Sequence, residues 1–384
     1  MLLRDQACVS GIGETAYMRG SSKSAFELQI ESSLKAIADA GLKPQQIDGV
    51  IPIGIVSGTA DDFIENFGIT DLRFSAVVPH GGASPVMALQ AAAAAVATGA
   101  CNHVLITFGR NVSAAAHKAG ARIHSMPQFH YVTEFEHPMG ASAPALLYAP
   151  MARRHMEIYG TTVAQFGEVA VAMREHALLS DNALMKKPIT LDDHRNSRMI
   201  ADPFRLLDCS LESDGGAAVV VSGAPQAADL RHRRVFISGV AEGHPDSPGS
   251  ITQRLDMTSL GLVKAAPRAF AMAGVTPADI QLTQIYDCFT YAVIRQLEDL
   301  GFCAKGEGGP FVEGGRLRLG GALPTNTHGG LLSQAHVWGL NHIVELVRQL
   351  RGDGGRAQVA NAELGLVTGY GDMGDGAVAI MRRG

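Results

Sequence analysis

The sequence contains few cysteines and no surplus of basic charge. Its cysteines, Cys8, Cys101, Cys209, Cys288 and Cys303, are scattered and include no Cys-x-x-Cys pair. An odd, scattered set supports neither a disulfide framework nor a zinc ribbon, so we expect reduced thiols and a cytoplasmic protein. The formal net charge of -5 also gives no reason to expect nucleic acid or an anionic membrane as a partner.

Segments that would export or anchor the chain are also lacking. Residues 1–7 include Arg4 and Asp5 and form no apolar run of signal length. The longest apolar stretch, 91–100, is rich in alanine and too short to span a bilayer. The histidines show no metal-binding spacing such as His-Glu-x-x-His. We therefore expect a soluble protein without a bound metal.

Glycine, by contrast, is abundant, with 44 residues, and it marks an internal repeat. β-Branched segments at 7–13 and 235–240 are each followed by a segment of helical periodicity, at 24–40 and 258–273. Both predicted helices end at a glycine suited to the left-handed position, and a proline then opens the next turn. These pairs are Gly41 with Pro44, and Gly274 with Pro277.

The repeat continues through both halves of the chain. A Gly-Gly pair precedes each of the next predicted helices, at 83–98 and 331–350. The remaining predicted strands are 50–55, 103–107 and 214–221 in the first half, and 282–286, 363–368 and 375–381 in the second. Strands that alternate with helices predict a duplicated α/β fold, with mostly parallel mixed sheets between helices.

The repeat also suggests where the chain divides. We predict an N-terminal half at 1–225 and a C-terminal half at 233–384. The first half carries a long insertion, about 110–203, which is rich in helical patterns, methionine and histidine. We expect this insertion to form a cap and a contact between two copies of the chain. Its methionine and aromatic residues at 126–148 fit either an apolar substrate or a dimer core.

Two glycine patterns have the spacing of a dinucleotide-binding fingerprint and begin at Gly11 and Gly369. That fingerprint requires a strand, a tight turn and then the N-terminus of a helix. A predicted loop follows the first pattern, and a terminal strand follows the second. We interpret both as structural turns and expect no bound cofactor.

The Gly-Gly pairs are better candidates for a site, because a predicted helix follows each of them. Backbone amides at a helix N-terminus can hold a thioester or enolate oxygen. The alternative is a pair of close-packed turns. The candidate binding residues are His80 and Gly82 in the first segment, and Asn326, His328, Gly329 and Gly330 in the second.

Three further side chains are candidates for chemistry. Tyr286 and Asp287 lie at the carboxyl end of a predicted strand, where open α/β sheets bind their ligands. Tyr286 would act as an acid or a base and Asp287 would orient a partner. Alternatively, the tyrosine packs under the Gly329 loop and the aspartate caps the next helix. His336, on the helix predicted at 331–350, would carry a proton or serve as a structural histidine.

Together these motifs resemble the thiolase superfamily, in particular the thiolase-like lipid-transfer proteins related to sterol-carrier-protein-type thiolases. The segment 286–290, Tyr-Asp-Cys-Phe-Thr, resembles the family's His-Asp-Cys-Phe-Ser. The segment 326–330, Asn-Thr-His-Gly-Gly, resembles its Asn-Pro-x-Gly-Gly. The segment 335–339 resembles the Gly-His-Pro-x-Gly element, which holds a catalytic histidine. The resemblance covers nearly the whole chain and implies a thiolase-like fold, a homodimer, an acyl-CoA substrate and a catalytic His336.

The sequence departs from the family at both cysteine positions. Gly82 stands where thiolases have the nucleophilic cysteine, and no cysteine occurs near 368–370, where the second is expected. Without a thiolate, ordinary thiolysis is not expected. Some members with this altered pattern resemble retro-aldolases that act on steroid-type 3-hydroxyacyl-CoA, together with a small partner carrying an OB fold and a zinc ribbon. The resemblance therefore implies a C–C lyase with such a partner, which binds coenzyme A only as part of its substrate.

A retro-aldol reaction assigns roles to the candidate residues. It needs a base for the β-hydroxyl, an acid for the enolate carbon and donors for the thioester oxygen. Tyr286 and His336 would supply the first two in either order, and Asn326 with the glycine amides would supply the third. Two alternatives stay open: a catalytically silent subunit that binds acyl-CoA or scaffolds an enzyme, and an acyltransferase or thiolase with an unusual nucleophile.

Overall fold

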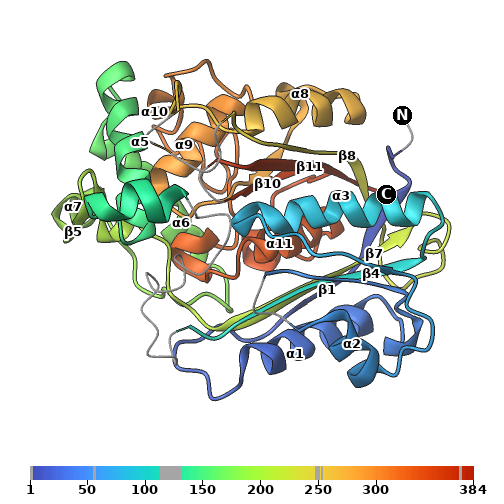
Figure 1. Cartoon of the computed structure of the whole chain (residues 1–384). Coiled ribbons are helices and arrows are strands. Elements are labelled where there is room, and N and C mark those ends of the chain that lie inside the picture. The colour runs from blue at the N-terminus through green and yellow to red at the C-terminus, as the bar shows by residue number, and fades with distance from the viewer. Residues whose placement is uncertain (1–2, 55–57, 113–130, 247–250, 252–253, 372–373) are drawn as a thin grey trace.

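The computed structural model describes residues 3–54, 58–112, 131–246, 251, 254–371 and 374–384. These residues form layers of helices and strands (Figure 1). Helices α1 (Ala25–Asp39) and α2 (Ala60–Phe67) cover the strands of the first half, and α8 (Leu262–Ala273) covers those of the second half. Helices α3 (Ser84–Ala97) and α11 (Leu340–Arg351) lie between the two sets of strands. Among the described helices, none combines the length and the apolar character needed to cross a bilayer.

Within the described residues, the main sheet has nine strands. Those of the first half are β1 Ala7–Glu14, β2 Gly49–Pro52, β3 Phe74–Ser75, β4 His103–Arg110 and β7 Gly215–Gly223. Those of the second half are β8 Val235–Gly243, β9 Leu282–Gln284, β10 Leu364–Tyr370 and β11 Gly376–Arg383. A separate two-stranded sheet joins β5 Met199–Ala201 to β6 Phe204–Arg205.

The strand order reveals the duplication. Across the sheet it is β3-β2-β4-β7-β1-β8-β11-β10-β9, so β1-β7-β4-β2 in one direction matches β8-β11-β10-β9 in the other. The duplicated α/β fold predicted from the sequence is therefore confirmed. The sheet is more antiparallel than predicted: β2–β3, β2–β4 and β9–β10 are parallel, whereas β7 and β11, which end each half, pair antiparallel with their neighbours.

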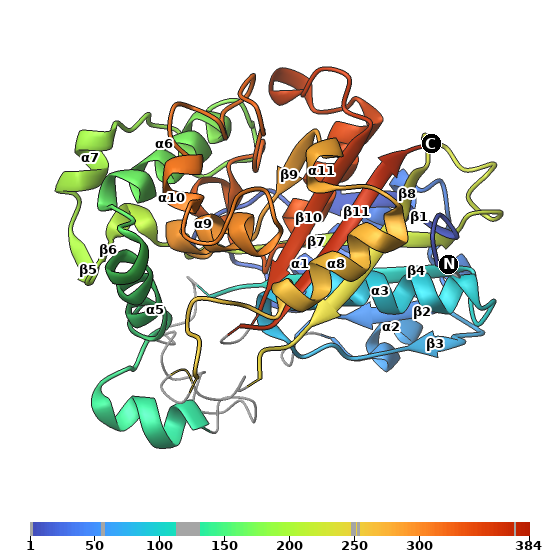
Figure 2. The same cartoon turned by 90° about the horizontal axis from the view of Figure 1, so that it is seen from above.

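The larger helices include those of the repeat and those of the insertion. They are α1 Ala25–Asp39, α2 Ala60–Phe67, α3 Ser84–Ala97, α5 Pro144–Tyr159, α6 Val163–Ala177, α7 Leu191–Asn196, α8 Leu262–Ala273, α9 Thr290–Asp299, α10 Gly308–Phe311 and α11 Leu340–Arg351. Helices α5, α6 and α7 gather at one end of the sheet near α9 and α10 (Figure 2), which confirms a helical insertion. Residues 113–130 of the insertion lie outside the described part.

The same local signals form both copies of the repeated unit. Gly41 and Gly274 have left-handed φ angles of +76° and +70°, as predicted. One glycine in each first strand also lets the following helix approach closely. A Cβ built on Gly11 would lie 2.1 Å from the carbonyl oxygen of Ala36, and one built on Gly239 would lie 2.2 Å from that of Ala269. Any side chain at either position would push α1 or α8 away from the sheet.

The prediction of a single helix at 331–350 is wrong. A π turn at Gly330–Gln334 is followed by an irregular segment, and α11 begins only at Leu340. Trp338 and Gly339 have φ angles of +57° and +82°, which no continuous right-handed helix permits. The Trp338 ring stacks on Phe108 with 4.9 Å between ring centroids. This contact with β4 stabilises the break.

Candidate functional site

Tyr286 and His336 meet beyond the end of β9. The Tyr286 hydroxyl lies 3.2 Å from Nε2 of His336. The Tyr286 backbone N–H donates to Oγ1 of Thr368 at 3.0 Å, and its carbonyl accepts from the Gln296 side chain at 2.7 Å. Because β10 and α9 hold its backbone and only 4% of the residue is exposed, the phenol has a fixed position.

The irregular segment before α11 positions His336. The His336 N–H donates to Oγ of Ser213 at 2.8 Å, and its carbonyl accepts from Nη1 of Arg110 at 3.2 Å. Nδ1 of its ring lies 3.2 Å from Oγ of Ser210. Burial, with the charge of Arg110, holds the pKa of His336 well below its usual range. A neutral ring that donates from Nδ1 to Ser210 leaves Nε2 to accept from the Tyr286 hydroxyl.

Gly82 lies directly against Tyr286. A Cβ built on Gly82 would lie 2.1 Å from Cζ and 2.3 Å from the hydroxyl oxygen of Tyr286. A cysteine at position 82 and a tyrosine at position 286 would therefore compete for the same space. The two departures from the thiolase pattern, at 82 and 286, have one steric explanation.

Asn326 and Asp287 are fully buried and hold backbone groups. Oδ1 of Asn326 accepts from the Ile285 N–H at 2.6 Å, and Nδ2 donates to the Ile285 carbonyl at 2.8 Å. Asp287 accepts from the N–H groups of Leu331 at 2.8 Å and Leu332 at 3.2 Å. These contacts favour structural roles for both side chains, and a contact of either with the substrate stays a prediction.

The second Gly-Gly pair is close-packed. A Cβ built on Gly329 would lie 2.6 Å from Cβ of Ala177, and one built on Gly330 would lie 2.0 Å from Oδ2 of Asp287. Their φ angles are +105° and +63°, and the Gly329 N–H donates to the Asn326 carbonyl at 2.8 Å. This geometry matches the close-packed turn that the sequence left as the alternative. It does not direct the Gly329 amide to a ligand.

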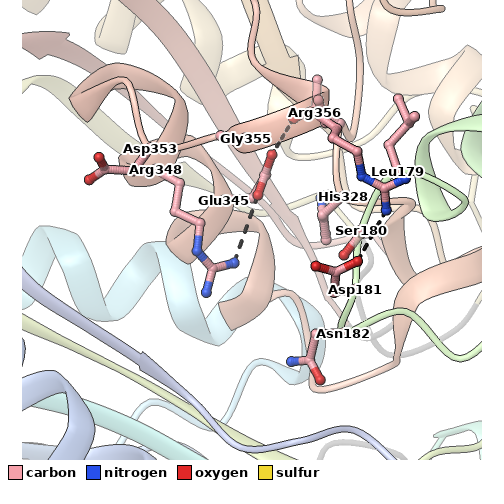
Figure 3. Close-up of a pocket in the computed structure, with 13 residues that line it drawn as sticks. Leu179, Ser180, Asp181, Asn182, His328, Glu345, Arg348, Asp353, Gly355 and Arg356 are labelled. Carbon is pink, nitrogen blue, oxygen red and sulfur yellow. Dashed lines mark hydrogen bonds and ion pairs between the residues drawn. The ribbon is translucent and has the colours of Figure 1, made fainter.

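His328 lines a different cavity, of about 390 Å³. Figure 3 shows it with Glu345 and Arg348 from α11, with Asp181 from a turn and with Arg356 from the 3-10 helix Gly355–Ala357. Within the described part of the chain, neither ring nitrogen of His328 has a hydrogen-bond partner. Burial holds its pKa well below the usual range. The His342 ring lies 4.8 Å from that of His328 and 6.2 Å from that of Tyr286.

His80 is partly exposed on the turn that leads to Gly82. Its Nδ1 lies 3.2 Å from Oδ2 of Asp375, and its backbone N–H donates to Oγ of Ser84 at 2.9 Å. The structure thus brings His80, Gly82, Tyr286 and His336 into one region. A contact between His80 and the substrate stays a prediction.

Aromatic side chains that the sequence analysis missed lie next to Tyr286. The Tyr370 ring lies 6.4 Å from that of Tyr286 and 5.5 Å from that of Tyr148. Tyr148, on α5 of the insertion, lies 5.2 Å from the ring of Phe289. Tyr370 stands where the second thiolase cysteine is expected, so its position in the family pattern was a signal in the sequence for this part of the site. Tyr148, Phe289 and Tyr370 thus form an aromatic wall beside Tyr286. Because Tyr148 belongs to α5, this contact supports a capping role for the insertion.

His176 connects α6 to the Asn326 loop. Its Nδ1 lies 3.2 Å from the Asn326 carbonyl, and its Nε2 accepts from the Leu319 N–H at 2.9 Å. One nitrogen donates and the other accepts, so the ring must be neutral. Burial lowers the pKa of His176 from 6.5 to about 4. Below pH 6.5 the unfolded chain binds a proton at this residue that the folded chain does not bind.

We therefore expect His176 to make the protein less stable in mild acid. Its contribution to the free energy of unfolding should fall by about 2 kcal/mol between pH 7 and pH 5. His176→Gln keeps a donor and an acceptor but cannot titrate, so its stability should depend less on pH. Urea denaturation of both proteins at the two pH values measures the difference. An equal loss of stability in the two proteins would contradict this role.

Comparison with known proteins identifies the family. Residues 243–383 match the family described as "Thiolase C-terminal domain-like". The 17-hydroxy-3-oxo-4-pregnene-20-carboxyl-CoA lyase of Mycobacterium tuberculosis is 40% identical over 91% of this chain and 93% of that protein. The steroid side-chain-cleaving aldolase of Thermomonospora curvata is also 40% identical, over 91% of this chain and 92% of that protein.

The chain belongs to the thiolase superfamily. Solved structures of other superfamily members agree. The Ltp2-ChsH2(DUF35) aldolase aligns with a TM-score of 0.93 and 37% identity, over 100% of this chain and 99% of that one. Human mitochondrial 3-ketoacyl-CoA thiolase aligns with a TM-score of 0.72 at 16% identity, which shows the fold alone. The family and the thiolase-like fold predicted from the sequence are confirmed.

Proposed function

We propose that this thiolase-superfamily protein catalyses retro-aldol cleavage of a 3-hydroxyacyl-CoA. The observation that carries the proposal is the Tyr286 hydroxyl, which lies 3.2 Å from a neutral His336 and occupies the space over Gly82 that a nucleophilic cysteine would need. The two relatives that are 40% identical are named as a lyase and an aldolase, which supports the same type of reaction.

The reaction requires one proton to be removed and later returned. A base takes the proton of the β-hydroxyl, the Cα–Cβ bond breaks, and its electron pair forms the enolate of the thioester while Cβ becomes a carbonyl carbon. Protonation of Cα then gives the shortened acyl-CoA. We assign the substrate contact to Tyr286, because its hydroxyl occupies the space over Gly82 where thiolases have the nucleophilic cysteine. His336 accepts the hydrogen bond of Tyr286 and shares the proton with it.

The substrate is a CoA thioester with an apolar acyl group. The aromatic wall of Tyr148, Tyr370 and Phe289 suits a hydrocarbon skeleton beside the reacting carbons. The relatives' names specify steroid substrates for those proteins. For this chain, a steroid-type side chain is the first substrate class to test.

We also propose two kinds of protein partner. The similar Ltp2-ChsH2(DUF35) aldolase supports a small second protein for this chain, with an OB fold and a zinc ribbon. A homodimer is the second proposal. Light scattering of the chain alone, and then with the co-expressed partner, tests both assemblies.

Analysis of CoA products by mass spectrometry tests the function. The chain, with and without its partner, is incubated with matched 3-hydroxyacyl-CoA and 3-ketoacyl-CoA thioesters. We expect the hydroxy substrate to give a shortened acyl-CoA without release of free coenzyme A. Cleavage of the keto substrate that depends on added coenzyme A would instead indicate an unusual nucleophile. No turnover in the complete complex would favour a silent acyl-CoA-binding subunit.

A further inference from the structure

Three side chains gather where β8 ends and β11 begins, close to the turn before Gly82. Nδ1 of His244 lies 2.7 Å from Oδ1 of Asp375, and Nδ1 of His80 lies 3.2 Å from the other carboxylate oxygen. One possible ligand atom from each residue lies within 4.8 Å of the other two. None of the three side chains transfers a proton in the proposed lyase reaction, and of the three only His80 is a predicted substrate contact.

The backbone around this cluster is rigid. Strands β8 and β11 run side by side (Figure 2), with Gly243 paired to Gly376. His244 and Asp375 are the next residues beyond that pair, so the sheet register places them opposite each other. A Cβ built on Gly371 would lie 2.1 Å from the His80 carbonyl oxygen, which shows how closely the third segment packs.

We propose that His80, His244 and Asp375 bind a divalent transition-metal ion. Two imidazole nitrogens and one carboxylate oxygen form a three-ligand set that leaves positions open for water or another ligand. The side chains of His80 and His244 are 38% and 44% exposed, so an ion can reach them, whereas that of Asp375 is 8% exposed. Neutral rings with their proton on Nε2 present both Nδ1 lone pairs to the ion.

The surroundings favour some ions over others. Arg254 lies near Asp375, since a Cβ built on Gly374 would lie 2.8 Å from Nη1 of that arginine. Its positive charge opposes every cation. Ions with high affinity for imidazole, such as Zn²⁺, Ni²⁺ and Co²⁺, overcome this repulsion better than Mg²⁺ or Ca²⁺, which prefer oxygen ligands. The ligands lie far apart in sequence, which explains why the sequence analysis predicted no metal.

Metal titration of the full chain tests the site without any measurement of activity. After treatment with a chelator, the protein is titrated with Zn²⁺ by calorimetry and with Co²⁺ by visible absorption. We expect one ion per chain and no thiolate charge-transfer band, because no cysteine belongs to the site. Added Mg²⁺ should not compete with Zn²⁺ or Co²⁺ for the site. His244→Ala and Asp375→Asn should each weaken Zn²⁺ binding by about tenfold or more.

His232→Ala is the matched control. His232 also pairs with a carboxylate, at 3.0 Å from Asp39, but it lies outside the cluster. Zn²⁺ affinity should be unchanged in this variant, and thermal melting checks that all three variants fold. Absence of Zn²⁺ binding, or equal affinity in His244→Ala and the parent, would overturn the proposal. The three residues would then be only a hydrogen-bonded cluster in which each ring donates to one oxygen of Asp375.

Discussion

Tyr286→Phe is expected to lower kcat/KM for 3-hydroxyacyl-CoA cleavage by about 10³-fold. The substitution removes the hydroxyl that lies 3.2 Å from His336, while the ring continues to fill the space over Gly82. The backbone contacts of Tyr286 with Thr368 and Gln296 do not depend on that hydroxyl. The loss should therefore appear in catalysis, with little change in thermal stability. Steady-state kinetics and a melting curve for each protein measure the two effects.

Tyr291→Phe provides a matched control for this experiment. Tyr291 is also buried, and within the described residues its hydroxyl has no hydrogen-bond partner. Its removal should leave both cleavage and stability close to those of the parent. If Tyr286→Phe kept most of the activity, the proton transfer would have to be assigned to other groups.

Gly82→Ala is expected to damage the site nearly as severely, by a steric route. Its new Cβ would fall 2.1 Å from Cζ of Tyr286, a distance that requires the ring or the backbone to move. Overpacking of this kind costs about 1–3 kcal/mol of stability. Displacement of the phenol by about 1 Å should lower cleavage by about 10²-fold. Gly82→Cys should behave in the same way and should not gain thiolase activity while Tyr286 is present.

A double-mutant cycle separates this clash from other effects of the alanine. In a Tyr286→Ala background the ring is gone, so Gly82→Ala should cost little further stability. The coupling free energy from urea denaturation of the four proteins should be about 1 kcal/mol or more. Additive losses would show that Gly82 is needed for another reason, such as the backbone conformation of its turn.

The repeat could be predicted because its signals are local. A glycine after a helix and a proline three residues later determine the same turn in both halves, as at Gly41 and Gly274. The interruption before α11 could not be predicted in this way. Ser213 and Arg110 hold the backbone of His336, and Phe108 stacks on Trp338. All three partners are far away in the sequence.

The candidate site could be predicted only in part, because its motifs are local in the sequence but the contacts of its side chains are not. Motif positions alone identified Tyr286, His336 and Gly82, which the structure brings together. The same motifs suggested substrate contacts for Asn326 and Gly329. In the structure the polar groups of both residues bind neighbouring backbone, and a substrate contact for either stays a prediction. Whether a buried amide faces a ligand or another loop depends on tertiary packing, which no single motif encodes.

The junction between β1 and β8 limits how this enzyme can move. Cys8 and Val9 pair with Phe236 and Val235, so the two halves share one continuous sheet. Helices α3 and α11 also contact strands from both halves. A hinge motion between the halves would break backbone hydrogen bonds and expose this shared interior to water. A bulky substrate must therefore enter, and the products must leave, without separation of the two halves.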